Sequence, residues 1–339
     1  MSRDFFGRFN HMQSVSSLFT YAIVFFSMTF IQMSAHAAET QAYPSRPVRL
    51  VVPFSPGPGL DVIGRAMAQK LSERWGRPMV VDNRGGAAGT LGADIVSKSA
   101  PDGYTLLIAG IGSLGTSKGM YPKLPYDPVR DFSPVMLIGR AQSALLVANS
   151  LPVSNVKQLI AYAKANPGQL NYSSAGSGST GHLSMETLRH LAGIDIVHIP
   201  HKGTVQGLTA MVTGEVQLSI QSFITAAPLI KSGRIRMISS TGTKRMVEMP
   251  NMPTVSEDLP GYEFYVWYGV VAPAGTPASL LGHINREIRQ VFQAQDLRDI
   301  LLSQGSEIIL SNEDEFRAFL AKEVMTWTAV IRRLGIREE

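Results

Sequence analysis

The most regular feature of the chain is a short apolar run that leads through a loop of small residues into an amphipathic stretch. Residues 48–52, with the sequence VRLVV, have the character of a buried strand. Three prolines and two glycines in residues 53–59 argue against a helix there. Asp61 then stands where an N-cap or first-turn acid belongs, ahead of an amphipathic helix predicted over residues 62–75. This region therefore predicts a strand, a loop and a helix in that order.

The same succession recurs along the rest of the chain. Strands are predicted at 79–81, 104–109, 145–148, 170–173, 194–199, 216–220 and 236–240. Helices are predicted up to residue 98, over 156–165 and 182–191, up to residue 212, and over 278–294, 297–304 and 314–334. Alternating strands and helices predict an α/β fold with mostly parallel sheets covered on both faces.

The order of these elements predicts two lobes of similar size, the second inserted into the first. A second series of strands and helices starts near residue 143, and the chain turns back near residues 265–269. We place the first lobe at residues 38–142 and 269–339, and the second lobe at residues 143–268.

The first 37 residues have the pattern of a secretory signal. Two arginines outnumber a single aspartate ahead of an apolar stretch at residues 18–31, and Ala35-His36-Ala37 offers a cleavage site. The apolar stretch is short for a membrane-spanning helix, which needs about 20 residues. We therefore expect an exported, periplasmic protein that is cut near Ala37-Ala38, rather than one held by an uncleaved anchor.

The composition narrows the class of protein further. The chain contains no cysteine, which excludes disulfides, thiolate chemistry and a lipidated N-terminal cysteine. Its formal net charge of +5 is not concentrated in a dense basic run, so it indicates mild attraction for anions rather than nucleic-acid binding. Because His190, His198 and His201 lack a metal-ligand spacing and no acidic calcium loop is present, we expect neither a metal nor a cofactor.

Three junctions between a strand and a helix are candidate anion sites. Glycine-rich or hydroxyl-rich loops open helices at residues 53–61, 174–182 and, more weakly, 200–204. The N-terminus of a helix presents unpaired N–H groups and a partial charge of about +0.5, so it can hold a carboxylate without a cationic side chain. In open α/β sheets, ligands gather beyond the carboxyl ends of the strands. We therefore expect one loop from each lobe to face the other across a cleft.

Other interpretations of the second loop compete with this one. Gly176-x-Gly178-x-x-Gly181 matches the dinucleotide-binding fingerprint and lies between a strand and a helix. However, Asp195 stands at the beginning of the next strand, whereas a ribose-binding acid belongs at its end, so an anion-holding loop or a purely structural turn fits better. A hydrolase would pair Ser177 or Ser179 with His182. No Gly-x-Ser-x-Gly elbow is present, and we favour His182 as a residue that donates to the ligand or caps its own helix.

Individual side chains near these loops have two possible roles. Lys202 follows a strand end and is the best candidate for a charged contact, with a solvated loop lysine as the alternative. Phe54 and Trp267 are candidates for the walls of the cleft, and ordinary core positions are the alternative for both.

Four segments carry a resemblance to a known family. Residues 43–54 (YPSRPVRLVVPF), 100–106 (APDGYTL), 121–128 (YPKLPYDP) and 272–277 (APAGTP) closely resemble the Bug receptors, which are the extracytoplasmic solute receptors of the tripartite tricarboxylate transporter family. The similarity extends in order over essentially the whole chain after the signal. It implies an α/β, two-lobed type II periplasmic-binding-protein fold that closes like a hinge, with the ligand cleft between the lobes.

The resemblance also implies the ligand-binding residues, which we match by position in three loops. The first loop contributes Phe54, Ser55, Gly57, Gly59 and Asp61, the second Ser177, Gly178, Ser179, Thr180 and His182, and the third His201, Lys202 and Gly203. Ligands of the family are mostly carboxylates, and ordered waters often mediate their contacts.

Three residues depart from the family pattern. Pro58 replaces the middle one of three consecutive glycines, which removes an N–H donor and stiffens the first loop. His201 stands where a tyrosine often precedes the lysine–glycine pair. Gln221, in the place of a frequent aspartate, offers only neutral hydrogen bonds to a ligand ammonium. The sequence therefore predicts a plain carboxylate rather than an amino acid as the ligand.

These observations together predict a periplasmic receptor that captures a small organic carboxylate by hinge closure, without chemistry. We expect a monomer that delivers its ligand to the membrane subunits of a tripartite tricarboxylate transporter. A carboxylate sensor that feeds a signalling system is the first alternative, and a secreted Ser/His hydrolase is the second.

Overall fold

The structure is a computed structural model that describes residues 43–57, 59–246, 249–303 and 305–336. Residues from Arg46 onward form one compact unit. The predicted signal peptide and Pro58 lie outside the described residues. None of the described helices is long and apolar enough to cross a lipid bilayer.

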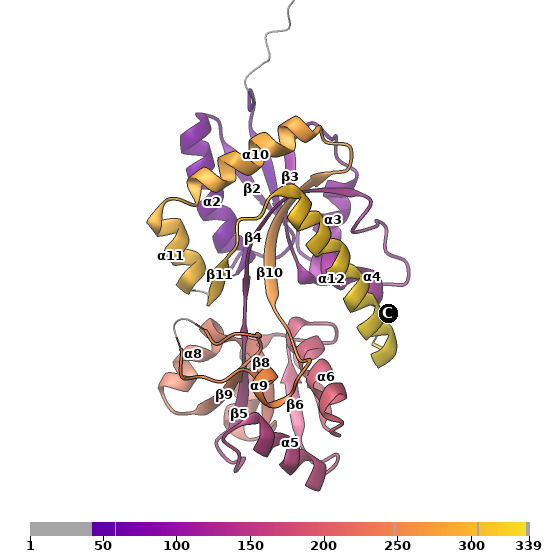
Figure 1. Cartoon of the computed structure of the whole chain (residues 1–339), viewed down its shortest axis with the longest axis vertical. Coiled ribbons are helices and arrows are strands. Elements are labelled where there is room, and N and C mark those ends of the chain that lie inside the picture. Colours follow the sequence, from indigo (N-terminus) through magenta and orange to yellow (C-terminus); the bar gives the residue numbers. More distant parts are fainter. Residues whose placement is uncertain (1–42, 58, 247–248, 304, 337–339) are drawn as a thin grey trace, which may run out of the picture. The chain divides into compact units, whose positions relative to one another are not determined.

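The first lobe is built on a six-stranded sheet with the strand order β11-β4-β10-β3-β1-β2 (Figure 1). Its strands are β1 (Val48–Val52), β2 (Met79–Asn83), β3 (Thr105–Gly110), β4 (Phe132–Ala141), β10 (Val266–Pro273) and β11 (Ser306–Ile308). Its helices are α2 (Leu60–Trp75), α3 (Thr90–Ser97), α4 (Ser117–Met120), α10 (Ala278–Val291), α11 (Gln295–Ser303) and α12 (Glu313–Leu334). A short 3-10 turn at Ala87–Gly89 and a π-helical turn at Ile111–Gly115 follow β2 and β3.

The second lobe is built on a five-stranded sheet with the strand order β7-β6-β8-β5-β9. Its strands are β5 (Ser143–Ala148), β6 (Asn171–Ser174), β7 (Val197–Pro200), β8 (Leu218–Ser222) and β9 (Ile235–Ser240). Its helices are α5 (Val156–Ala165), α6 (Thr180–Ala192), α7 (Thr204–Thr213), α8 (Phe223–Lys231) and α9 (Val255–Asp258).

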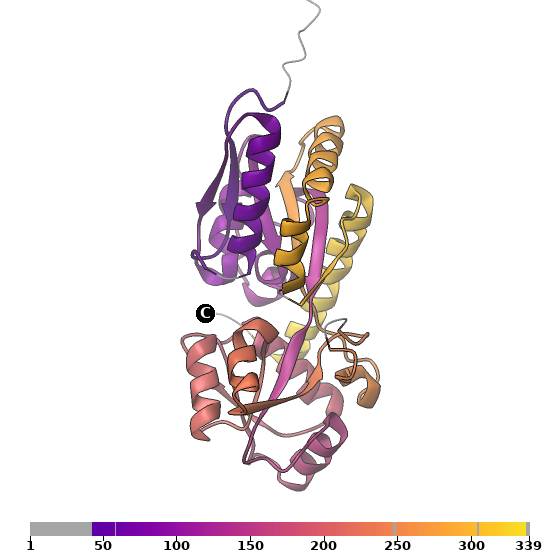
Figure 2. The same ribbon diagram turned by 90° about the vertical axis from the view of Figure 1, so that its left-hand side faces the viewer.

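Two crossings connect the lobes (Figures 1 and 2). The first is a single residue, Gln142, between β4 and β5. The second leads from α9 through residues 259–265 into β10. All strands of the second sheet thus lie between β4 and β10 in the chain. The expected boundary at 142/143 falls at the first crossing, and that at 268/269 falls inside β10; both boundaries remain predictions.

The prediction of mostly parallel sheets is wrong. Parallel pairing joins β1 to β2 and β3, and β6 to β7 and β8. The other five strand pairs, which involve β4, β5 and β10, are antiparallel. β5 and β10 follow the crossings, so they enter their sheets from the other lobe and not through a covering helix, which is the connection that enforces parallel pairing. β4 leads out of its sheet into the first crossing.

β4 and α8 are among the elements that the sequence did not predict. β4 contains Pro134 and Gly139, which weaken a strand pattern, and it is nonetheless almost wholly buried. α8 contains Pro228 within the helix and has no side-chain cap at its N-terminus. In both cases tertiary packing outweighs the local preference of the residues.

Candidate ligand-binding cleft

A cavity of about 380 Å³ lies between loops of the two lobes. The first lobe lines it with Phe54, Leu60, Ala87, Ala88, Gly110, Ile111, Gly112, Thr116 and Tyr121. The second lobe contributes Ala175, Ser177, Gly178, Ser179, Thr180 and Leu183, and β10 contributes Val266 and Trp267. No lining residue is acidic or basic, so any polar recognition here comes from backbone groups and hydroxyls.

Two helices, one from each lobe, begin at the cavity. Leu60 is the first residue of α2 and Thr180 the first residue of α6, and both line the cavity. N–H groups in the first turn of a helix have no partner within the helix. In α6 the Ser179 Oγ accepts one of them, the N–H of His182, at 3.4 Å. The N–H groups of Thr180 and Gly181 remain as donors at the edge of the cavity, and the partial positive ends of both helices favour an anion there.

The glycines of the second loop have structural reasons for their positions. Gly176 and Gly178 have φ values of 113° and 72°, which residues with a side chain rarely adopt. Gly181 lies so close to β8 that a Cβ atom would stand 2.5 Å from the carbonyl oxygen of Ile220. The fingerprint of three glycines therefore serves the turn and the close packing of α6 on the sheet.

A stack of rings lies behind the second loop. The imidazoles of His182 and His198 stack with their ring centroids 4.0 Å apart and their planes nearly parallel, at 10°. The Tyr172 ring continues the stack, with its centroid 4.8 Å from that of His198. His182 Nδ1 accepts the N–H of Gly178 at 2.9 Å, and His198 Nε2 contacts Ser174 Oγ at 2.7 Å. Burial lowers the pKa of His182, and burial with the adjacent His182 ring lowers the pKa of His198 to about 4. Both imidazoles are therefore neutral near pH 7 and brace the loop.

Asp61 braces the first loop in a similar way. Its Oδ2 accepts the N–H of Gly57 at 3.1 Å and Arg65 Nε at 3.0 Å, while its Oδ1 accepts Asn83 Nδ2 at 2.8 Å. Asn83 also donates to the carbonyl oxygen of Phe54 at 3.0 Å. Although burial opposes its charge, these hydrogen bonds keep the pKa of Asp61 below its usual value. The carboxylate thus ties the loop to β2.

A strained segment in the cavity wall has no clear signal in the sequence. Ala87 and Ala88 have φ values of 47° and 53°, a conformation that costs a non-glycine residue about 1–2 kcal/mol. The neighbouring chain is close: a Cβ atom on Gly112 would lie 2.8 Å from the carbonyl oxygen of Ala88. Only the flanking glycines at 85, 86 and 89 marked a turn here, because alanine carries no signal for positive φ.

The structure brings five of the predicted site residues into the cavity wall, namely Phe54, Ser177, Gly178, Ser179 and Thr180. Trp267 also lines it and is fully buried. Gly57, Asp61 and His182 instead make hydrogen bonds within their own loops. Outside the wall lie Ser55, Gly59, His201, Lys202, Gly203 and Gln221. Ligand contacts by all of these residues remain a prediction.

The third loop and Gln221 lie apart from the cavity wall. Gly203 is the N-cap of α7, His201 Nδ1 contacts the carbonyl oxygen of Ile199 at 3.0 Å, and Lys202 is exposed. Gln221 is buried, and its Nε2 donates to Ser219 Oγ at 3.2 Å. Within the described part of the chain, no group of three or more His, Asp or Glu side chains is arranged to hold a metal ion.

Comparison with known proteins relates this geometry to a family. The model of the tripartite tricarboxylate transporter family receptor matches residues 63–336. BugT of Bordetella pertussis (strain Tohama I) is 33% identical over 312 residues, which are 91% of this chain and 96% of BugT. A protein from the tcbD-tcbE intergenic region of Pseudomonas sp. (strain P51) is 35% identical over 300 residues, 88% of this chain and 89% of that protein.

Solved structures with the same architecture include two that hold dicarboxylates. An R. palustris protein solved with adipate is 35% identical, with a TM-score of 0.77 over 87% of this chain and 100% of that chain. MatC from Rhodopseudomonas palustris, with bound malate, is 29% identical, with a TM-score of 0.73 over 85% of this chain and 100% of MatC. The expected two-lobed α/β fold of periplasmic binding proteins is confirmed. The chain belongs to the family of tripartite tricarboxylate transporter receptors.

Proposed function

We propose that this chain captures a small organic carboxylate in the cleft between its lobes and delivers it, unchanged, to the membrane subunits of a tripartite tricarboxylate transporter. One observation carries the proposal: the N-termini of α2 and α6 meet at a cavity whose lining contains no charged side chain. Each helix end provides donors and about half a positive charge, so the two ends together suit an acid with two carboxylates.

The lining also supports a plain acid over an amino acid. An ammonium group in this cavity would meet the positive ends of two helices and no carboxylate. Burying an unpaired charge costs several kcal/mol, whereas the hydroxyls of Ser177 and Thr180 and the first-turn N–H groups can replace the water around a carboxylate. The ligands of the R. palustris protein with adipate and of MatC with malate are acids that carry no ammonium group.

Capture without chemistry fits the positions of the hydroxyl and imidazole groups. His182 Nδ1 accepts the Gly178 N–H, and its ring stacks on His198. Ser179 Oγ accepts the His182 N–H as a helix cap. Neither group stands ready as the nucleophile or base of a hydrolase, which needs a side chain-to-side chain hydrogen bond between them. Closure would instead come from bending at Gln142 and at residues 259–265.

We also propose that the chain works as a monomer in the periplasm after removal of its signal peptide. This role is tested by measuring uptake of the bound acid in two strains that both contain the membrane partners, one with the gene for this chain and one without it. A deletion that leaves uptake unchanged but abolishes a transcriptional response to the acid would support the sensor instead.

Binding is tested by calorimetry of the processed chain with adipate, malate and glutamate, after native mass spectrometry has identified any acid that co-purifies. Thr180→Val should weaken binding of the dicarboxylate by about tenfold, because a hydrogen bond to a charged group is worth about 1.5–3 kcal/mol. Thr209→Val, on α7, is the control, since its hydroxyl bonds only the carbonyl oxygen of Val205. Binding of glutamate alone, or recovery of a chemically altered acid, would contradict the proposal.

A further inference from the structure

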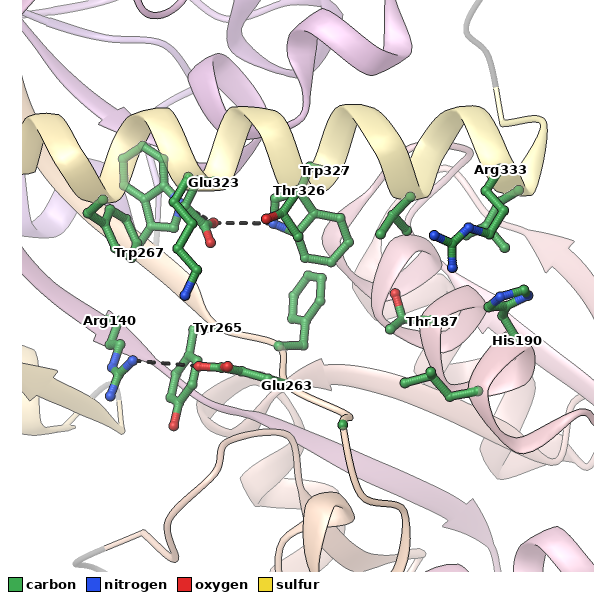
Figure 3. Close-up of a pocket in the computed structure, with 17 residues that line it drawn as sticks. Arg140, Thr187, His190, Glu263, Tyr265, Trp267, Glu323, Thr326, Trp327 and Arg333 are labelled. Carbon is green, nitrogen blue, oxygen red and sulfur yellow. Dashed lines mark hydrogen bonds and ion pairs between the residues drawn. The ribbon is translucent and has the colours of Figure 1, made fainter.

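Figure 3 shows a second cavity, of about 370 Å³, whose lining also includes Trp267. Its walls come from α12, from α6 and from residues 261–265 of the second crossing. Trp267 lines both cavities, and its side chain is fully buried. The two spaces are therefore neighbours with a shared wall, and the second one, like the first, is formed by both lobes.

The middle of this cavity is aromatic. Phe264 of the crossing and Trp327 of α12 meet edge to face, with ring centroids 5.2 Å apart and an interplanar angle of 71°. Trp267 and Phe319 make a similar contact at 5.7 Å and 89°. These contacts leave no room for a further ring between the paired side chains, so a flat ring that enters the cavity would pack on the outer side of this aromatic cluster. The volume is within the range of sites that hold small molecules.

Several charged residues in the lining already have partners. Glu323 accepts the indole N–H groups of Trp267 and Trp327 at 3.0 and 3.2 Å, and burial raises its pKa. Arg140 pairs with Glu307 at 2.9 Å and Glu263 at 3.8 Å, and it lies over the Tyr265 ring at 4.0 Å. Arg140, Glu263 and Tyr265 gather at one end of the cavity (Figure 3).

The opposite end is different. Arg333 of α12 faces Thr187 and His190 of α6 there (Figure 3). Within the described residues, the side chain of Arg333 has no hydrogen bond or ion pair, and the lining at this end contains no acidic residue. A guanidinium beside an imidazole and a hydroxyl is a favourable setting for a carboxylate, which it can hold in a bidentate manner.

We propose that this second cavity binds a small aromatic carboxylate. The ring lies against Phe264 and Trp327, and the carboxylate reaches Arg333, with His190 and Thr187 beside it. The ligand thereby touches α12 of the first lobe and α6 of the second, so it bridges the lobes outside the main cleft. The proposal goes beyond capture in the main cleft and does not depend on the identity of the acid held there.

Calorimetry of the full processed chain with phenylacetate tests the proposal. Phenethylammonium, which has the same aromatic ring but the opposite charge, is the comparison ligand. Two variants address the site: Arg333→Gln removes the cation, and Leu191→Trp fills the cavity from an exposed position in its wall. Both should weaken phenylacetate binding at least about fivefold. Phenethylammonium should bind at least about tenfold more weakly than phenylacetate.

Matched controls separate this site from the main cleft and from general attraction of anions. Arg332→Gln removes the neighbouring cation on α12, which does not line the cavity, and Ser177→Trp obstructs the main cleft from an exposed loop position. Both should leave phenylacetate affinity within about twofold. The proposal is overturned if phenylacetate does not bind at about 10 mM, if Ser177→Trp abolishes binding, or if Arg332→Gln weakens it as much as Arg333→Gln.

Discussion

Replacement of Gly181 by alanine tests whether the start of α6 is held against the sheet by the absence of a side chain. The new Cβ atom would lie 2.5 Å from the carbonyl oxygen of Ile220 and 3.4 Å from Gln221 Nε2. The first contact is with backbone, which cannot rotate away, so the first turn of the helix has to move outward by roughly 0.9 Å to restore ordinary contact distances. Forced repacking of this kind costs about 1–3 kcal/mol.

The helix propensity of alanine works in the opposite direction. In a helix interior, alanine is about 0.8–1 kcal/mol better than glycine, and less than this at an end. The net expectation for Gly181→Ala is a loss of about 1–2 kcal/mol in the free energy of unfolding. Because the displaced turn carries the N–H groups at the cleft, the affinity for the proposed carboxylate ligand should also fall, by about tenfold.

The matched control is Gly282→Ala, inside α10. The nearest atoms to its new Cβ would be Arg286 Nη1 and Glu313 Oε1, both at 3.5 Å and both at the ends of flexible side chains. This variant should be more stable than the wild type by about 0.5–1 kcal/mol. Urea denaturation followed by circular dichroism measures both, and calorimetry measures the ligand affinity. If Gly181→Ala keeps wild-type stability and affinity, close packing at the start of α6 does not organise the cleft.

Two further predictions concern the groups behind the loops. The pKa of His198, about 4 in the fold, lies below the ordinary value of about 6.5, so its contribution to stability is complete above pH 6.5 and is lost as the pH falls toward 4. Between pH 7 and pH 5 the free energy of unfolding of the wild type should fall by about 2 kcal/mol because of this group. Urea titrations of His198→Gln should show a smaller fall over the same pH range, and an equal fall would count against a buried neutral imidazole at this position. Asp61→Asn should lower the free energy of unfolding by about 1–3 kcal/mol, because an amide nitrogen would then face a hydrogen-bond donor. In the control Glu73→Gln, which changes an exposed residue of the same helix, the free energy of unfolding should stay within about 0.5 kcal/mol of the wild-type value. Thermal melts measure both variants, and similar effects of the two would refute the bracing role of Asp61.

The elements that the sequence predicted well are those with local signals. The strand at Val48–Val52 and the helix at Val156–Ala165 have the predicted bounds. The helix is capped at its start by Asn155, whose side chain accepts the N–H of Gln158 at 2.8 Å. Residues next to the helix start therefore determine where it begins. The direction of β5 and β10 in their sheets has no such signal. It depends on which lobe the chain arrives from, and that is a property of the whole topology.

The same distinction applies to the cleft. The glycines of the second loop pointed to an unusual backbone, which the φ values of Gly176 and Gly178 confirm. Spacing along the chain placed Asp61 and His182 at the mouths of helices but could not say which way their side chains turn. That direction is set by partners far away in the sequence, Asn83 on β2 and His198 on β7. A loop can be predicted from its own residues, whereas the face that it shows to a ligand requires its neighbours.

This arrangement places the ionisable groups Asp61 and His182 one layer behind the wall of the cavity that we propose for the ligand. Asp61 fixes the first loop and His182 the second, each through a backbone N–H, while the wall of the cavity stays uncharged. A receptor has to release its ligand as well as bind it, and a buried cation in direct contact would make dissociation costly. Fixed N–H groups give the geometry needed for recognition with a smaller charge. Substitutions at these two positions should therefore change affinity through the loops that they fix. Binding above about pH 6.5 should follow the ionisation of the acid and not that of the cleft.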